Sequence, residues 1–280
     1  MSGMVRIAAA VRAMEPALVI ESAAAPDVWM YAGMVALSAG ACAVASMVGL
    51  AGGLIITPVL MLMGMPPPVA ASAGLAATLS SSASSAAAYA RQKRIDYRMA
   101  IRLGALATPG TILGAVVLAD AESGMFGILF AAVLAGSAAY IFLRSKLGGG
   151  GISNARLVMV LSASASFMAG IISSFFGIGG GVIFVPLLVA VVGMGMMRAA
   201  PTSMLAMLMT STTAIIMHAL LGHTDAVMGL LFAAGGLAGG LAGARISLLM
   251  KENHLRAVAA VFLSSIAANL VWDTLSTNAQ

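Results

Sequence analysis

Long apolar runs separated by short polar or Gly- and Pro-containing breaks dominate the chain. A helix needs about 20 mostly apolar residues to cross the hydrocarbon core of a bilayer. Most runs approach that length, so the pattern predicts an all-α polytopic membrane protein with about ten transmembrane helices. The runs fall at 28–48, 50–64, 69–90, 100–119, 124–143, 157–176, 178–196, 199–221, 226–244 and 257–272.

Composition supports the membrane assignment, since 61% of the residues are apolar and only 8% are charged. A soluble domain carries about 25% charged residues. This scarcity of charge excludes a soluble enzyme, a nucleic-acid-binding domain and a disordered chain, and it makes the lipid bilayer the expected environment. Residues 1–27 contain Arg12, Glu15 and Glu21 and lack the clean apolar core of a signal peptide, so they are interpreted as a mobile tail.

The basic residues predict an orientation, because Lys and Arg gather in cytoplasmic loops. If the basic loop 91–98 is cytoplasmic, ten crossings place nearly every other basic residue on the same side, and only Arg6 and Arg12 of the tail are exceptions. The prediction is a multi-pass protein of the cytoplasmic (inner) membrane with both termini outside. The other segments placed on the basic face are 144–156, Arg198 and 245–256.

An internal repeat organises the sequence. The segment Gly49-Leu-Ala-Gly-Gly-Leu-Ile-Ile-Thr-Pro58 reappears 128 residues later as Gly177-Ile-Gly-Gly-Gly-Val-Ile-Phe-Val-Pro186. With one inserted residue the register continues, so 28–148 and 156–272 are predicted to be two copies of one unit. The later matches are Tyr89-Ala90 with His218-Ala219, Ile95-Asp96 with Thr224-Asp225, and Gly110 and Gly114 with Gly239 and Gly243.

Equivalent loops of the two copies carry opposite charge bias. The segment 91–102 holds five basic residues, whereas its counterpart around Asp225 holds none. The loop at Asp120 has no basic residue, while its counterpart 245–256 has three. This exchange predicts two inverted five-helix repeats, an arrangement typical of secondary transporters that work by alternating access.

The two Gly-rich segments are the leading candidates for substrate binding. Glycine allows a positive φ and close approach of a ligand, and a helix that starts after it presents unpaired N–H groups to an anion. Pro58 and Pro186 are expected to kink the helices that follow. Tight helix packing is the alternative interpretation. The candidate residues are Gly49, Gly52, Gly53, Gly177, Gly179, Gly180 and Gly181.

These features resemble a known family. The segment 177–188, its weaker copy at 49–60 and the basic loop that ends in Ile95-Asp96-Tyr97 are similar to the TauE/SafE family of sulfite and organosulfonate exporters, over about 28–272. The resemblance implies an inner-membrane permease for small sulfur-containing oxyanions. The chain departs from the family pattern at Ala51, where glycine is common, and at Ala226, where an aromatic residue is frequent.

Hydroxyl side chains gather at matching positions of the third and eighth spans. Hydroxyls can donate hydrogen bonds to an oxyanion without a buried charge. They can equally bond to carbonyls of their own helix or join neighbouring helices. The candidates for substrate contact are Ser81, Ser82, Thr202, Ser203, Thr210 and Ser211.

Titratable groups are scarce inside the predicted spans, where no Asp or Glu lies deep in the sequence of any run. A carboxylate proton relay is therefore disfavoured. His218 is the candidate for proton coupling, because its ordinary pKa lies near neutrality. The alternative is a histidine that is hydrogen-bonded to a neighbouring helix.

Two competing functions remain open at the level of sequence. The methionine groups 61–65 and 194–197 could serve a Cu(I) permease, although methionine also fills irregular apolar gaps. A non-transporting scaffold subunit is the other alternative, and no enzymatic activity, cofactor or resident metal is expected. The single Cys42 excludes a cysteine cluster. The expected partners are a small anionic substrate and lipid, with a homodimer as one possible assembly.

Overall fold

The computed structural model describes residues 28–119 and 155–250. The chain divides into two units, Met1–Met34 and Val35–Gln280, and the arrangement below concerns the described residues of the second. The tail and the runs predicted at 124–143 and 257–272 lie outside the described residues.

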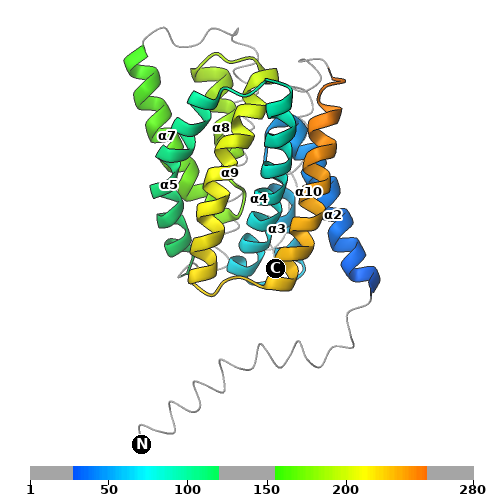
Figure 1. Ribbon diagram of the computed structural model, residues 1–280. Helices are drawn as coiled ribbons and strands as arrows, with labels where there is room; N and C mark the ends of the chain where they lie inside the picture. The colour runs from blue at the N-terminus through cyan, green and yellow to red at the C-terminus, as the bar shows by residue number, and fades with distance from the viewer. Residues whose placement is uncertain (1–27, 120–154, 251–280) are drawn as a thin grey trace, which may run out of the picture. The chain divides into compact units, whose positions relative to one another are not determined.

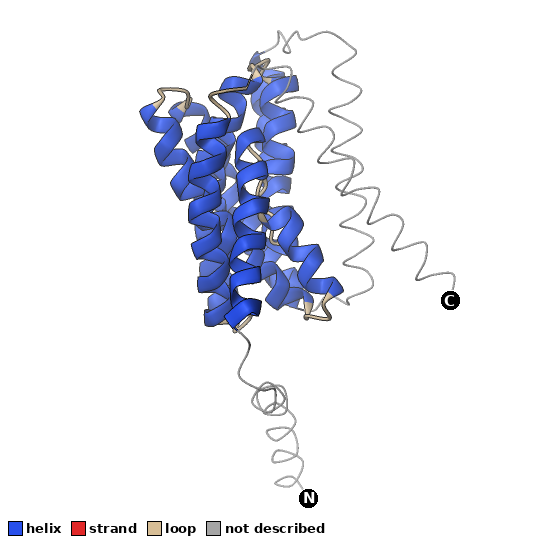
Figure 2. Cartoon of the chain, turned by 90° about the vertical axis from the view of Figure 1, so that its right-hand side faces the viewer, coloured by secondary structure: helices blue, strands red, loops and turns tan. Residues whose placement is uncertain are grey.

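The described chain is helical, as predicted, and Figure 2 draws no strand in it. Five of its helices are long and apolar enough to cross a membrane: α2, α5, α7, α9 and α10. The elements before the gap are α2 (Val28–Val48), α3 (Gly53–Leu62), α4 (Pro67–Arg91) and α5 (Tyr97–Ala119). Those after it are α7 (Ala155–Phe176), α8 (Gly181–Pro186), the π-helical turn η1 (Leu187–Val191), α9 (Met196–Leu220) and α10 (Ala226–Ile246).

The two short spans begin later than the apolar pattern predicts. Helix α3 starts at Gly53 and not at 50, and α8 starts at Gly181 and not at 178. Positive φ angles interrupt the helical backbone at Gly49 before α3 and at Gly177, Gly179 and Gly180 before α8. The helical hydrogen-bond pattern changes at only one of the two prolines. Helix α3 continues through Pro58, whereas at Pro186 the α-helix ends and a π-helical turn follows. Proline lacks the N–H that an α-helical hydrogen bond requires.

Helix α4 is long but less apolar than the other long helices, since it carries six serines and a threonine. Sixteen of its 25 residues are buried, and it packs against α3, α9 and α10. A helix that is covered by protein does not need a lipid-compatible surface, so its hydroxyls are tolerated. Helices α4 and α9 therefore form the centre of the described structure (Figure 1).

The two Gly-xxx-Gly pairs, at Gly110 and Gly114 and at Gly239 and Gly243, are helix-packing faces. A Cβ atom at Gly110 or Gly114 of α5 would collide with the backbone of Phe167 or Ile171 on α7. A Cβ atom at Gly239 or Gly243 of α10 would collide in the same way with α2. The residues met on α2 are Ala39 and Ala43, which the repeat register makes the counterparts of Phe167 and Ile171. Small residues let the helix backbones approach closely.

Helices α4 and α9 run in opposite directions (Figure 1). At one end the Arg94 Nε, just after α4, donates to the Met197 carbonyl at the start of α9 over 2.9 Å. The Arg94 Nη1 also donates to the Ser247 Oγ, just after α10, over 3.3 Å. At the other end the Ser72 Oγ, near the start of α4, donates to the His223 carbonyl after α9 over 2.9 Å. The basic loop 91–98, Arg198 and Arg245 therefore share one end of the described structure.

Candidate functional site

The two Gly-rich segments lie antiparallel and side by side. A Cβ atom at Gly181 would lie 2.9 Å from the Gly49 carbonyl oxygen, and one at Gly53 would collide with the Gly177 carbonyl oxygen. Between these pairs, Ala51 stands opposite Gly179. Because each copy contributes the same positions, an approximate two-fold axis passes between residues 51 and 179.

The backbone explains why glycine is needed at four of the predicted positions. Gly49 has φ +77°, and its counterpart Gly177 has φ +74°. Gly179 and Gly180 have φ +69° and +87°, whereas Gly52, the counterpart of Gly180, has φ −62°. Positive φ is costly for residues with a Cβ atom. The first segment thus has one left-handed residue and the second has three, which accounts for the tolerance of alanine at position 51.

The second segment presents free backbone donors. In the first segment the Gly53 N–H donates to the Thr78 Oγ1 over 3.2 Å. The N–H groups of Gly179, Gly180 and Gly181 have no hydrogen-bond acceptor among the residues that the structure describes. Successive backbone N–H groups in turn conformations form anion-binding concavities. The second segment therefore has one more unpaired backbone N–H than the first, in which the Gly53 N–H is paired and those of Ala51 and Gly52 have no acceptor among the described residues.

Two of the six predicted hydroxyls reach the Gly-rich segments. The Ser203 Oγ donates to the Gly49 carbonyl over 2.9 Å, and the Thr210 Oγ1 donates to the Gly179 carbonyl over 2.9 Å. Both side chains are fully buried on α9. They fix the carbonyls of the segments and so hold the N–H groups in place.

The other four hydroxyls make different contacts. Thr202 accepts a hydrogen bond from the Asp96 N–H over 3.1 Å and so joins α9 to the residue before α5. Ser81 and Ser211 donate to carbonyls of their own helices, and the Ser82 Oγ is buried without a partner among the described residues. Of the four, only Ser82 has its hydroxyl free for a ligand.

The structure adds three residues that the candidate site did not include. Thr78 of α4 and Met207 of α9 lie beside the Gly-rich segments and occupy equivalent positions in the two copies. The Thr57 Oγ1 of α3 lies next to Gly74, and it is buried without a partner among the described residues. Thr57 stands one helical turn after Gly53, and that spacing from the glycine motif is the sequence signal that could have found it.

His218 lies away from the Gly-rich segments, in the last turn of α9. Its side chain is fully buried, and its Nε2–H donates to the Ser174 carbonyl of α7 over 3.1 Å. His218 thus makes the hydrogen bond to a neighbouring helix that the alternative interpretation describes, and its role in proton coupling stays a prediction. Its counterpart Tyr89 makes the equivalent contact, since the Tyr89 Oη donates to the Ser46 carbonyl of α2 over 2.8 Å.

Each of these two rings lies near a basic side chain that follows it by five residues in the sequence. The Arg94 guanidinium lies 5.3 Å from the centre of the Tyr89 ring, and the His223 ring lies 5.6 Å from the His218 ring. Burial lowers the pKa of both Arg94 and His223. Equivalent contacts therefore join neighbouring helices at the two ends of the α4–α9 pair. At one end the basic side chain is Arg94, a permanent cation, and at the other it is His223, which is neutral at pH 7.

The described residues give little support to a metal site. Among them there is no group of three His, Cys, Asp or Glu side chains that could hold a metal ion. Met63 is 60% exposed. The Met197 Sδ lies 3.2 Å from the Arg94 Nη2. A cation beside a thioether repels a bound metal ion, which disfavours a Cu(I) site there.

Comparison with known proteins identifies the family. The family model described as "Sulfite exporter TauE/SafE" matches residues 34–270. The chain belongs to the TauE/SafE family. It is also similar to the "Probable membrane transporter protein YunE" of Bacillus subtilis (strain 168), with 25% identity over 264 residues that cover 86% of this chain and 97% of the relative. No solved structure matches. The chain is thus a multi-pass protein of a membrane transporter family.

Thr210→Val is predicted to lower the free energy of unfolding by about 1–3 kcal/mol, because the buried Gly179 carbonyl loses its hydroxyl donor. The matched control is Thr212→Val, whose exposed hydroxyl bonds only to its own helix. The control is expected to change stability by less than about 0.5 kcal/mol. Unfolding of the purified protein in detergent measures both, and equal losses would contradict the prediction.

Proposed function

We propose that this protein is a secondary permease for small sulfur-containing oxyanions, such as sulfite or organosulfonates, and that it works by alternating access between two inverted five-helix repeats. The observation that carries the proposal is the antiparallel pair of Gly-rich segments. There the non-helical backbone of both copies meets, and α3 and α8 begin.

The chemistry around the segments suits an anion. The free N–H groups of Gly179 to Gly181 and the unpartnered hydroxyl of Thr57 are donors without formal charge. Irregular backbone at membrane depth is found where it is buried in protein or lines a cavity, and discontinuous helices form the substrate sites of secondary transporters. In the described part, the charged side chains lie in loops or within the first or last two turns of their helices.

The proposal of alternating access is supported by the equivalence of the contacts in the two copies. A Cβ atom at Gly49 would collide with Ala200 of α9, and one at Gly177 would lie 2.5 Å from the Ala71 carbonyl of α4. Ala71 and Ala200 are counterparts in the repeat register. Each copy therefore docks its Gly-rich segment on the central helix of the other, and exchange of the two conformations would carry the site from one side to the other.

Transport of sulfite into proteoliposomes tests the function. We expect saturable flux with the unmodified protein and a loss of about tenfold or more with Gly180→Ala, which forces a Cβ atom into φ +87° at the site. The matched control is Gly64→Ala, with φ +84° and no atom within 4 Å of the added Cβ, so it carries similar backbone strain outside the site.

The same assay decides between the competing functions. Flux of Cu(I) alone that is lost on replacement of Met63, Met65, Met194 and Met196 would establish the metal permease. Absence of flux for sulfite, sulfoacetate, thiosulfate and Cu(I) would favour the scaffold. Equal flux with Gly180→Ala and Gly64→Ala would show that the substrate does not bind at the second Gly-rich segment.

His218→Tyr tests the proposed proton coupling through this residue. Tyrosine at this position can keep a hydrogen bond to the Ser174 carbonyl, as Tyr89 does with Ser46, but it does not titrate between pH 5 and 8. We expect the variant to transport sulfite and to lose the pH dependence of the flux in that range. His223→Gln is the control, because His223 is the neighbouring histidine at this end of α9, with its ring 5.6 Å from the His218 ring. An unchanged pH profile in His218→Tyr would exclude the coupling role.

The proposed orientation places the basic end in the cytoplasm and both termini outside. Loop 91–98 and Arg245 share one end of the described structure, as the clustering of Lys and Arg in cytoplasmic loops requires. An alkaline phosphatase domain fused after Gln280 is expected to be active in cells, while a fluorescent protein fused there should stay dark. The reverse pattern would rule out ten crossings in this orientation.

A further inference from the structure

Two side chains lie on either side of the approximate two-fold axis of the proposed site. Thr78 and Met207 are both the twelfth residue of a 25-residue helix, α4 and α9, so each stands at the middle of a central helix. Both are fully buried. The repeat register makes them counterparts, and they approach the same glycine from the two copies.

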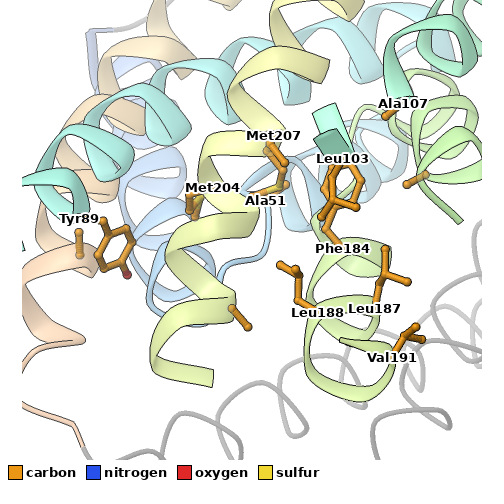
Figure 3. Packing of buried hydrophobic residues seen from close by; sticks show 14 residues of the cluster. Ala51, Tyr89, Leu103, Ala107, Phe184, Leu187, Leu188, Val191, Met204 and Met207 are labelled. Carbon is orange, nitrogen blue, oxygen red and sulfur yellow. The ribbon is translucent and has the colours of Figure 1, made fainter. Parts of the chain in front are cut away.

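That glycine is Gly179, which stands opposite Ala51 on the axis. A Cβ atom at Gly179 would collide with the Thr78 Cγ2 and would lie 3.4 Å from the Ala51 Cβ and 3.6 Å from the Met207 Sδ. A Cβ atom at Gly181 would lie 2.5 Å from the same sulfur. Figure 3 shows Met207 reaching from α9 to the side of Ala51. The thioether thus covers the segment whose N–H groups have no acceptor among the described residues.

The two members of the pair differ in what they can do. The Thr78 Oγ1 accepts the Gly53 N–H, so its hydroxyl is tied to the start of α3. No hydrogen bond is recorded for the Met207 side chain among the described residues. Methionine is unbranched and has three rotatable side-chain bonds, so it can move aside without a loss of polar contacts. Of the pair, Met207 is the side chain that a bound anion would displace.

We propose that Met207 determines the size of the substrate. This inference rests on the proposed transport of sulfur oxyanions. The oxyanion group binds to the N–H groups of the second Gly-rich segment, and the Met207 side chain fills the space beside it into which an organic substituent would extend. Sulfite, which has no substituent, fits with a small movement of the thioether. An alkanesulfonate must push the whole side chain out of a packed cluster, at a cost that grows with the length of its chain.

The test is the ratio of initial transport rates for butanesulfonate and sulfite in proteoliposomes. Met207→Ala removes three heavy atoms beside Gly179 and Gly181, and we expect it to raise the ratio at least about tenfold, which corresponds to about 1.4 kcal/mol. The matched control is Met204→Ala. Met204 is equally buried and lies one turn earlier on α9, and it is not among the nearest neighbours of an added Cβ atom at Gly179 or Gly181. The control should leave the ratio within about twofold of the unmodified protein.

Met207→Thr is the second variant, because it removes less volume and copies the residue found at position 78. It should raise the ratio in the same direction if Met207→Ala does not fold. A ratio that stays constant in the folded Met207 variants, while the unmodified protein transports sulfite, would overturn the inference alone. Absence of sulfite flux in the unmodified protein would overturn the proposed function and the inference with it.

Discussion

The close antiparallel contact of two non-helical backbone segments is the constraint on which the rest of the structure depends. Backbone polar groups inside a membrane need partners within the protein, because lipid offers none. Ser203 and Thr210 supply two of these partners from α9, and Thr78 supplies one from α4. The central helices are therefore rich in hydroxyls, and other helices must shield them from lipid.

Glycine residues also allow the helices that cover α4 and α9 to pack closely together. The Gly-xxx-Gly faces of α5 and α10 bring α7 and α2 against them at backbone distance, so that the bundle closes without large side chains. The same contact recurs in both copies at equivalent positions, as do the ring-to-carbonyl bonds of Tyr89 and His218. The proposed alternating access needs such equivalence, because an exchange of roles between the two copies would then give two conformations of similar energy.

Much of this arrangement could be predicted from sequence, because it depends on residue spacing along one chain. Apolar runs fixed most helix ends within three residues, and the glycine motifs marked where helices break. The contacts of the hydroxyls could not be predicted, since the repeat register says which positions correspond but not which face the axis. Thr202 and Ser203 are neighbours in sequence, yet one bonds near α5 and the other to Gly49. The role proposed for Met207 could not be predicted from sequence, because methionine is an ordinary core residue.

The neutral character of the site has an energetic consequence for transport. A buried charge opposite an anion would bind it strongly, and the unoccupied site would then carry an uncompensated charge that costs several kcal/mol. Hydrogen bonds from N–H and hydroxyl groups contribute about 0.5–1.5 kcal/mol each, or about 1.5–3 kcal/mol when the acceptor is charged. A few such bonds at Gly179 to Gly181 would retain an oxyanion and still release it. In the proposed site the Met207 thioether lies beside Gly179 and Gly181 and would move aside for a ligand, so a site between two similar copies could also select its substrate by size.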